Sequence, residues 1–209
     1  MTFEVTKRNE LFTELLLVEP QMLVRVPRTW NINSPSFKMD RIDIDTFERD
    51  AELRFGPYGP GLEYMRTAYR ARETEGDITF QTIALMECLP GPLERKTPDS
   101  RAYGEVELIY AREKEASEWA RLDHQRLSEK FSSIDGMLSP SLIESKINGV
   151  DMFAFSTSDS SNPADPVIKR RSYLQTDSGA LLFIETYYQA SEKIAKQTAS
   201  IVRRTKPAP

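Results

Sequence analysis

The chain has 209 residues, and its 28 Lys and Arg against 32 Asp and Glu give a formal net charge of −4. This balance argues against a strongly basic nucleic-acid-binding protein. Apolar residues make up 39% of the chain and charged residues 29%, which favours a folded core over a disordered chain. Because this length suits one domain, we expect a single domain over residues 1–209, in which residues 40–101 could form an elaborated subregion.

A single cysteine, Cys88, and a single histidine, His124, limit the chemistry open to the chain. One thiol excludes an intramolecular disulfide framework and any multi-cysteine zinc or iron–sulfur site, and we expect no metal and no cofactor. No apolar run is long enough to span a membrane, and no signal peptide is recognisable at the start of the chain. We therefore expect a cytoplasmic protein, in which a lone free thiol is ordinary.

The first half of the chain combines apolar runs with turn residues. Residues 11–18 and 22–26, split by a Glu-Pro-Gln sequence, predict a hairpin or a bent pair of strands. Glycine and proline at 56–61 predict a rigid turn cluster, and helical spacing of apolar residues at 62–73 predicts a helix. Alternation over residues 78–89 predicts a further strand.

The second half has the clearer pattern. An apolar stripe at helical spacing predicts a helix over 113–132, and a second stripe predicts one over 189–204. Residues 206–209, which follow the second helix, are predicted to be a frayed tail. Alternating residues predict strands at 105–110, 142–147, 150–156, 168–175 and 180–188, with a turn at Asn148-Gly149.

This order of elements predicts the fold class. Runs of strands interrupted by few helices are typical of an α+β fold with a mostly antiparallel sheet. Such a sheet needs helices to cover its apolar face, and both predicted helices in the second half carry one apolar stripe. We therefore expect helices packed on an antiparallel sheet, with an extended N-terminal half.

No residue stands out as catalytic. His124 falls on the apolar stripe of its helix, which favours a packing role, and Cys88 follows a carboxylate, Glu87, which would raise the pKa of the thiol. The chain therefore leans away from an enzyme. The alternative is an enzyme of unrecognised type that uses His124 with Cys88 or with a carboxylate such as Glu87, Glu105 or Glu107.

Binding residues are sought among surface aromatics and acids. Asp43 and Asp45 share one face of a short segment, but the glycine of a calcium-binding loop is missing, so a solvated edge is favoured. A second alternative is a small-ligand carrier with a groove between sheet and helix, lined by Trp30, Trp119 and two tyrosines. The candidate binding residues are Trp30, Asp43, Asp45, Tyr58, Tyr187 and Tyr188.

Part of the sequence resembles a known fold family. The segments are 22–30, which ends a strand with Pro-Arg-Thr-Trp, then Ile147-Asn148-Gly149-Val150, the run 179–184, and the helix end at 199–203. This pattern resembles the α/β/α sandwich shared by PsbP-type and bacterial DcrB-type proteins. Residues 40–101 depart from it, being longer and richer in Pro and Gly turns.

The resemblance implies a non-catalytic role, since such proteins act as binding modules, adaptors and chaperones, including chaperones of type VI secretion effectors. Some bacterial immunity proteins look similar. We therefore expect a protein-binding module of a bacterial cytosol, most simply an immunity protein or a chaperone or adaptor for a secreted effector. Its partner would be another protein, such as a toxin or effector, and not nucleic acid, and the oligomeric state is left open.

Overall fold

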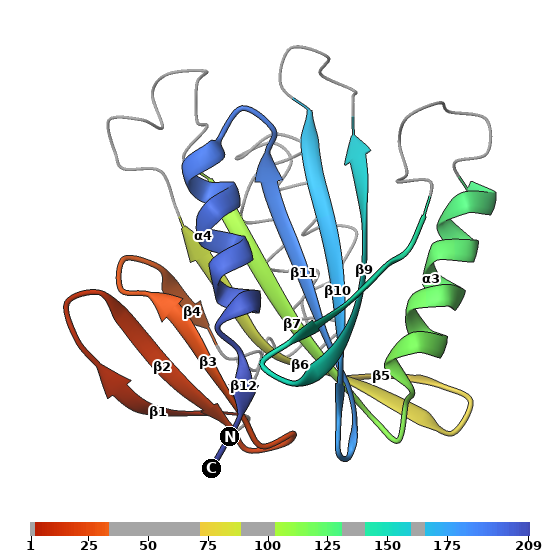
Figure 1. Ribbon diagram of the computed structural model, residues 1–209, viewed down its shortest axis with the longest axis horizontal. Coiled ribbons are helices and arrows are strands. Elements are labelled where there is room, and N and C mark those ends of the chain that lie inside the picture. Colours follow the sequence, from red (N-terminus) through yellow and green to blue (C-terminus); the bar gives the residue numbers. More distant parts are fainter. Residues whose placement is uncertain (1–2, 34–71, 89–102, 131–140, 160–165) are drawn as a thin grey trace, which may run out of the picture.

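The computed structural model describes residues 3–33, 72–88, 103–130, 141–159 and 166–209. Within these ranges the chain forms two antiparallel sheets and two helices (Figure 1). The helices are α3 (Ala116–Lys130) and α4 (Glu192–Arg203). The strands are β1 (Phe3–Arg8), β2 (Phe12–Leu17), β3 (Met22–Pro27), β4 (Asn31–Asn33), β5 (Arg72–Glu75), β6 (Ile78–Cys88), β7 (Gly104–Arg112), β8 (Ile143–Ile147), β9 (Val150–Asp159), β10 (Val167–Thr176), β11 (Gly179–Tyr188) and β12 (Lys206–Pro207).

The small sheet has the order β1-β2-β3-β12. Its centre is the hairpin predicted from the two apolar runs, and β2 and β3 pair antiparallel with Leu17 opposite Met22. Buried and partly exposed residues alternate along both strands, because each strand places every second side chain on the same face. This alternation turns Leu15, Leu17 and Val24 toward the large sheet.

The large sheet has the order β4-β6-β7-β11-β10-β9-β8, with β5 pairing to the same edge of β6 as β4. The strands β8 to β11 follow one another as neighbours, so the second half of the chain is one antiparallel meander. A two-residue turn joins β8 to β9, and both its residues, Asn148 (φ 51°) and Gly149 (φ 85°), have positive φ. Such turns match the twist of a hairpin, as the Asn-Gly pair predicts.

The end of the chain contradicts the predicted frayed tail. Lys206 and Pro207 pair with Leu23 and Met22 of β3, and the Ala208 N–H donates to the Gln21 carbonyl at 3.0 Å. The preceding residue, Thr205, is fully buried and its hydroxyl donates to the Ile201 carbonyl. The helix α4 therefore delivers the tail to the open edge of β3, a placement that depends on tertiary packing.

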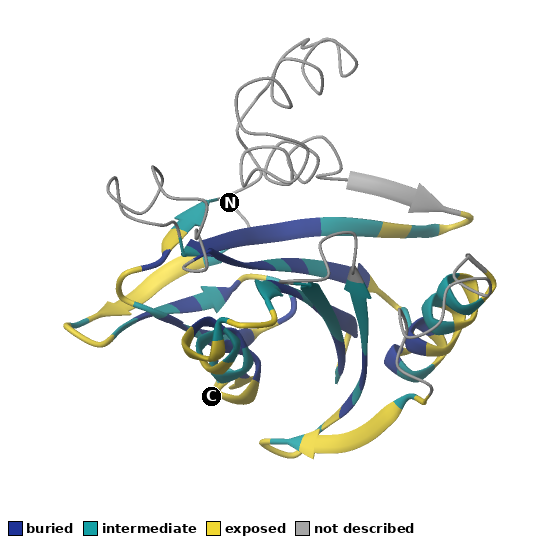
Figure 2. Ribbon diagram, turned by 90° about the horizontal axis from the view of Figure 1, so that it is seen from above, coloured by how far each residue is buried: buried dark blue, intermediate teal, exposed yellow. Residues whose placement is uncertain are grey.

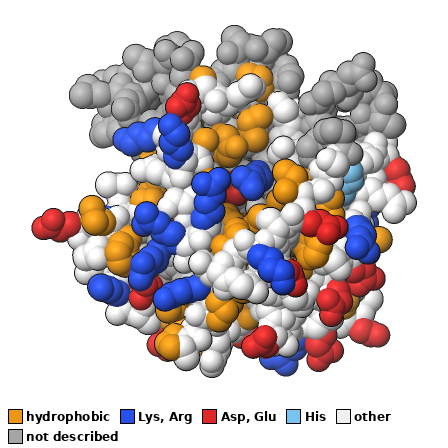
Figure 3. Space-filling model, in the orientation of Figure 1, with side chains coloured by type: hydrophobic (Ala, Val, Ile, Leu, Met, Phe, Trp, Pro, Cys, Tyr) orange, Lys and Arg blue, Asp and Glu red, His pale blue; other side chains and the backbone are white. Residues whose placement is uncertain are grey.

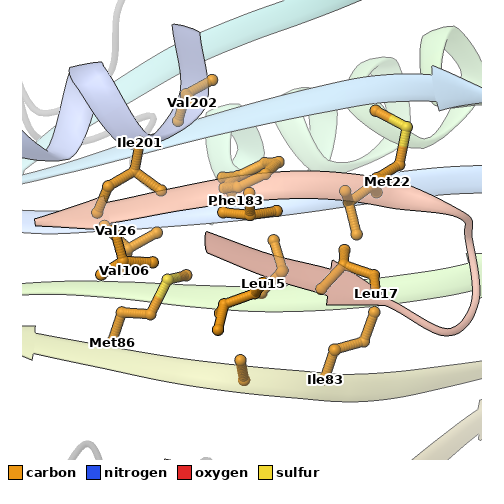
Figure 4. Close-up of a cluster of buried hydrophobic side chains, with 14 of the residues drawn as sticks. Leu15, Leu17, Met22, Val26, Ile83, Met86, Val106, Phe183, Ile201 and Val202 are labelled. Carbon is orange, nitrogen blue, oxygen red and sulfur yellow. The ribbon is translucent and has the colours of Figure 1, made fainter. Parts of the chain in front are cut away.

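The two faces of the large sheet carry separate cores. The first core joins the small sheet and α4 to the first face of the large sheet, as Figure 4 shows for Leu15 and Leu17 against Ile83 and Phe183. The second core lies on the other face, under α3, and contains Trp119, Phe155, Tyr173 and Leu182. Buried residues accordingly run along the inner strands in Figure 2.

Each helix buries one face. The buried residues of α4 are Ile194, Thr198, Ile201 and Val202, which recur at helical spacing. The helix comes so near β7 that a Cβ built on Gly104 would lie 2.2 Å from the Ile194 Cγ2. On the other face, α3 packs through the small Ala116 and Ala120 and the large Trp119.

The expected α+β class with a mostly antiparallel sheet is confirmed. Helices lie on opposite faces of the large sheet, and the small sheet shares the first face with α4 (Figure 1). The predicted helix 62–73 falls mainly outside the described residues, and its last two positions, Arg72 and Glu73, begin β5 instead. Among the described helices, neither is long and apolar enough to cross a lipid bilayer.

Candidate functional site

The lone histidine and the lone cysteine lie on opposite faces of the large sheet. The Cys88 side chain packs against the first core from β6. The His124 ring packs edge-on against Phe155 of the second core, with centroids 5.1 Å apart. The sheet therefore separates them, and the pairing of His124 with Cys88 left open by the sequence is not formed.

The carboxylates considered as partners of His124 share its side of the sheet but lie far across it. Met86, Val106 and Leu108 point into the first core, so the alternating Glu87, Glu105 and Glu107 point to the second face. Three strand spacings separate β7 from β9, which carries the Phe155 that His124 contacts. At about 4.8 Å per spacing this is roughly 14 Å, so neither β6 nor β7 brings a carboxylate to His124.

Glu87 and Glu105 form a buried acidic pair on this second face, opposite each other on β6 and β7. Burial raises the pKa of Glu87 to about 7, against the lowering effect of Asn33, whose Nδ2 donates to Oε2 at 3.0 Å. The Tyr103 hydroxyl donates to the Glu105 carboxylate. Within the described ranges no three His, Cys, Asp or Glu side chains converge as a metal site.

The predicted binding residues do not converge either. Trp30 is buried in the first core, and its indole Nε1 donates to Gln197 of α4 at 3.2 Å, so it holds α4 on the sheet. Trp119 belongs to the second core, and so the predicted ligand groove with both tryptophans in its wall is not formed. Tyr187 packs partly buried against the first core beside α4, and Tyr188 is partly buried at the end of β11. Asp43, Asp45 and Tyr58 lie outside the described residues.

A different groove lies between α4 and β8, on the first face of the large sheet. We call it the α4–β8 groove, and its volume is about 340 Å³. Its walls are β8 and the last turns of α4, and the inner strands form its floor. The lining residues are Ile143, Ser145, Lys146, Ile147, Met152, Arg170, Glu185, Ala199, Val202 and Arg203.

The floor of the groove holds a buried carboxyl group. Glu185 of β11 is 1% exposed, and neither of its oxygens accepts a hydrogen bond. Burial raises its pKa, while Arg170 and, less strongly, the hydroxyls of Thr198 and Ser172 act in the opposite direction. Because a buried carboxyl without hydrogen bonds is costly when ionised, this position is unusual for a residue with only a packing role.

Two guanidinium groups lie beside this acid. The Arg170 side chain, from the neighbouring position on β10, is 31% exposed, and its Nε lies 3.8 Å from the Glu185 Oε1. Arg203 reaches the groove from the last turn of α4 and also lowers the pKa of Glu185. Figure 3 shows Lys and Arg side chains gathered on the surface around α4.

The outer wall of the groove is an edge strand. In the described part of the sheet, β8 pairs with β9 alone, and Figure 2 shows it as an exposed strand. The two-residue turn makes Ile147 and Val150 a hydrogen-bonded pair, and bonding alternates from there. The N–H and C=O groups of Glu144 and Lys146 therefore point away from β9.

The side chains of β8 divide between the two faces. Ile147 packs against the first core, so Ile143 and Ser145 share its side by alternation. Ile143 is 54% exposed at the rim of the groove. Lys146 instead pairs with its cross-strand neighbour Asp151, with Nζ 2.9 Å from Oδ1.

Comparison with known proteins does not assign the chain to a family. No model of a known protein family matches the sequence, and no curated protein is significantly similar to it. The chemistry of the groove and its edge strand is therefore the basis for a function.

Proposed function

We propose that this protein is a non-catalytic binding protein that takes up an extended segment of a partner protein along β8. The observation that carries the proposal is the edge of β8, whose backbone groups at Glu144 and Lys146 point outward from the strand that forms one wall of the α4–β8 groove. An added strand would satisfy those groups, which is a common mode of peptide recognition. The exposed Ile143 at the rim offers apolar contact beside this edge.

The positions of the reactive side chains favour binding over catalysis. The two candidates for nucleophile and base, Cys88 and His124, point to different cores. The groove itself holds apolar side chains, two guanidinium groups and one buried carboxyl, which is a recognition surface with fixed polar groups. The more specific role, in the cytoplasm, is that of an immunity protein or effector chaperone with a PsbP-like fold. Its support is the sequence resemblance alone.

A random peptide library tests the proposal. The peptides are displayed as fusions through their C-termini and selected on the purified protein. We expect selected peptides to bind the wild type and Glu144→Ala, but to lose about tenfold or more in affinity for Glu144→Pro. Proline removes the outward N–H of Glu144 and is tolerated at sheet edges, whereas alanine keeps that N–H. Equal binding to both variants, with unchanged thermal unfolding, would exclude pairing at β8.

A second candidate function is binding of a small molecule, and the groove volume favours it. About 340 Å³ lies at the lower end of the range for small-molecule pockets. A small ligand held by the floor needs no backbone pairing at β8. Glu144→Pro therefore distinguishes a peptide from a small ligand. A small ligand raises the midpoint temperature of thermal unfolding, and this increase should be the same in Glu144→Pro as in the wild type.

A further inference from the structure

The floor of the α4–β8 groove contains a charge arrangement that edge pairing alone does not need. The buried Glu185 carboxyl has two oxygens without hydrogen bonds, and its ion pair with Arg170 is long, at 3.8 Å. Ser172 Oγ beside it is also buried and unpaired, while Thr198 Oγ1 donates to the Ala195 carbonyl. The protein atoms of the groove floor therefore leave hydrogen-bonding capacity at Glu185 and Ser172.

The groove is more suited to an anion than to a cation. Its cationic groups are the guanidinium groups of Arg170 and Arg203, both on the same side of the sheet as the groove. The third cation of the lining, Lys146, is neutralised by Asp151 at 2.9 Å. Two guanidinium groups against one carboxyl leave net positive charge, and a planar guanidinium matches a carboxylate.

We propose that the α4–β8 groove selects partner segments that carry an acidic side chain, which Arg170 and Arg203 bind above the buried carboxyl of Glu185. This inference rests on the proposed function, because the segment is the strand that pairs with β8. The ligand is a side-chain carboxylate within the segment, since a strand paired along β8 continues past the groove floor in both directions.

The acid binds to the form of the protein in which Glu185 is protonated. An incoming carboxylate next to an ionised Glu185 would place two negative charges over the same guanidinium groups, and a protonated Glu185 removes that repulsion. The charged and titratable groups that face Glu185 are Arg170 from β10, Arg203 from α4 and Tyr187 on β11. Tyr187 has a raised pKa, so among these groups Glu185 is the one whose protonation relieves the repulsion.

Two libraries of peptides of equal length test the acidic selectivity separately from the proposed pairing with β8. One library excludes Asp and Glu, and the other excludes Lys and Arg. Both are fused through their C-termini, so only side chains supply carboxylates. We expect only the library that contains Asp and Glu to give peptides that bind along β8, which are recognised because Glu144→Pro abolishes their binding. If neither library gives such binders, the proposed function fails. Such binders from both libraries, or from the acid-free library only, would overturn the acidic selectivity and leave the function standing.

Arginine variants test the contact with the selected acidic peptide. Arg203→Gln and Arg170→Gln should each weaken its binding about tenfold or more. The matched control is Arg204→Gln, which removes the same charge from an exposed residue outside the groove lining and should change affinity less than about twofold. A loss in the control equal to that in Arg203→Gln would show only general charge attraction and overturn the contact. Arg203 is the decisive variant, because its exposed side chain leaves the core intact.

Titration of binding tests the role of Glu185. Affinity for the acidic peptide, measured by calorimetry across a pH series, should fall as the pH is raised and Glu185 ionises. Glu185→Gln mimics the protonated acid, so this variant should bind at least as tightly as the wild type and should lose this dependence on pH. Weaker binding by Glu185→Gln, or an unchanged pH dependence in that variant, would contradict the proposal.

Discussion

The two faces of the large sheet differ in how they are closed. On the first face, the hairpin β2–β3 and α4 cover an aliphatic core of side chains such as Leu15, Leu17 and Ile201, all fully buried. On the second face, α3 covers an aromatic cluster in which Trp119 and Tyr173 meet edge to face at 5.4 Å. The first face is left open at the α4–β8 groove.

The difference concerns the buried acids as well. Glu87 on the second face is held by the Asn33 amide, whereas Glu185 on the first face has no hydrogen bond to either oxygen. A satisfied buried polar group is compatible with a structural role. Unpaired buried polar atoms also occur on the second face, at Thr186 and Arg171. The groove beside Glu185 therefore distinguishes the first face and supports placing the proposed recognition site there.

The largest effect is expected from removing a central side chain of the first core. Phe183 is fully buried between the small sheet and the large one (Figure 4). Phe183→Ala should lower the free energy of unfolding by about 3–5 kcal/mol, because both the buried ring and its packing are lost. Urea denaturation measures this. A loss below about 1 kcal/mol would show that the small sheet is not firmly packed there.

Glu87→Gln should change the pH dependence of stability. The pKa of Glu87 is about 7 in the folded protein against 4.5 in the unfolded chain, so the ionised form is penalised on folding. Its contribution to stability is present below pH 4.5 and is lost as the pH rises through 7. The variant should exceed the wild type by up to about 3 kcal/mol at alkaline pH. Denaturation at several pH values should show this gap closing in acid, and a constant gap would refute the explanation.

Gly104→Ala tests the close approach of α4 to β7. The added Cβ would lie 2.2 Å from the Ile194 Cγ2, so the helix must shift, which costs about 1–3 kcal/mol. The control is a double-mutant cycle with Ile194→Ala, which removes the colliding group. The two changes should be clearly non-additive in the free energy of unfolding. Simple additivity would mean that the helix does not rest on Gly104.

The smallest effect is expected at His124. Its ring contacts Phe155 edge-on from α3 and is partly exposed, so we expect His124→Leu to change stability by less than about 1.5 kcal/mol. The variant should also leave the affinity for library-selected peptides unchanged. A marked loss of binding would move the functional face to α3 and reverse the comparison.

Much of the fold could be predicted because half-buried strands alternate. The runs 11–18 and 22–26 gave the β2–β3 hairpin, and the Asn-Gly pair gave the β8–β9 turn. The tail at Lys206 could not be placed, because its pairing with β3 depends on where α4 ends. The alternation of buried and exposed residues also does not predict that the strands divide into two sheets, or that the small sheet packs on the first face of the large one.

The groove was harder to predict than the strands. Glu185 is a lone acid within the apolar run 180–188, and this was the signal available in the sequence. Its neighbours, Arg170 and Thr198, come from a cross-strand register and a docked helix, which no local pattern fixes. Trp30 and Trp119 attracted attention as aromatics, yet each packs into a different core.

Backbone amide exchange along β8 tests the central claim most directly. In the free protein, the amides of Glu144 and Lys146 should exchange rapidly, while those of Ser145 and Ile147, which bond to β9, should be protected. Addition of a selected acidic peptide should protect Glu144 and Lys146 as well. If the peptide binds while these two amides still exchange freely, β8 is not the recognition edge and the account is wrong.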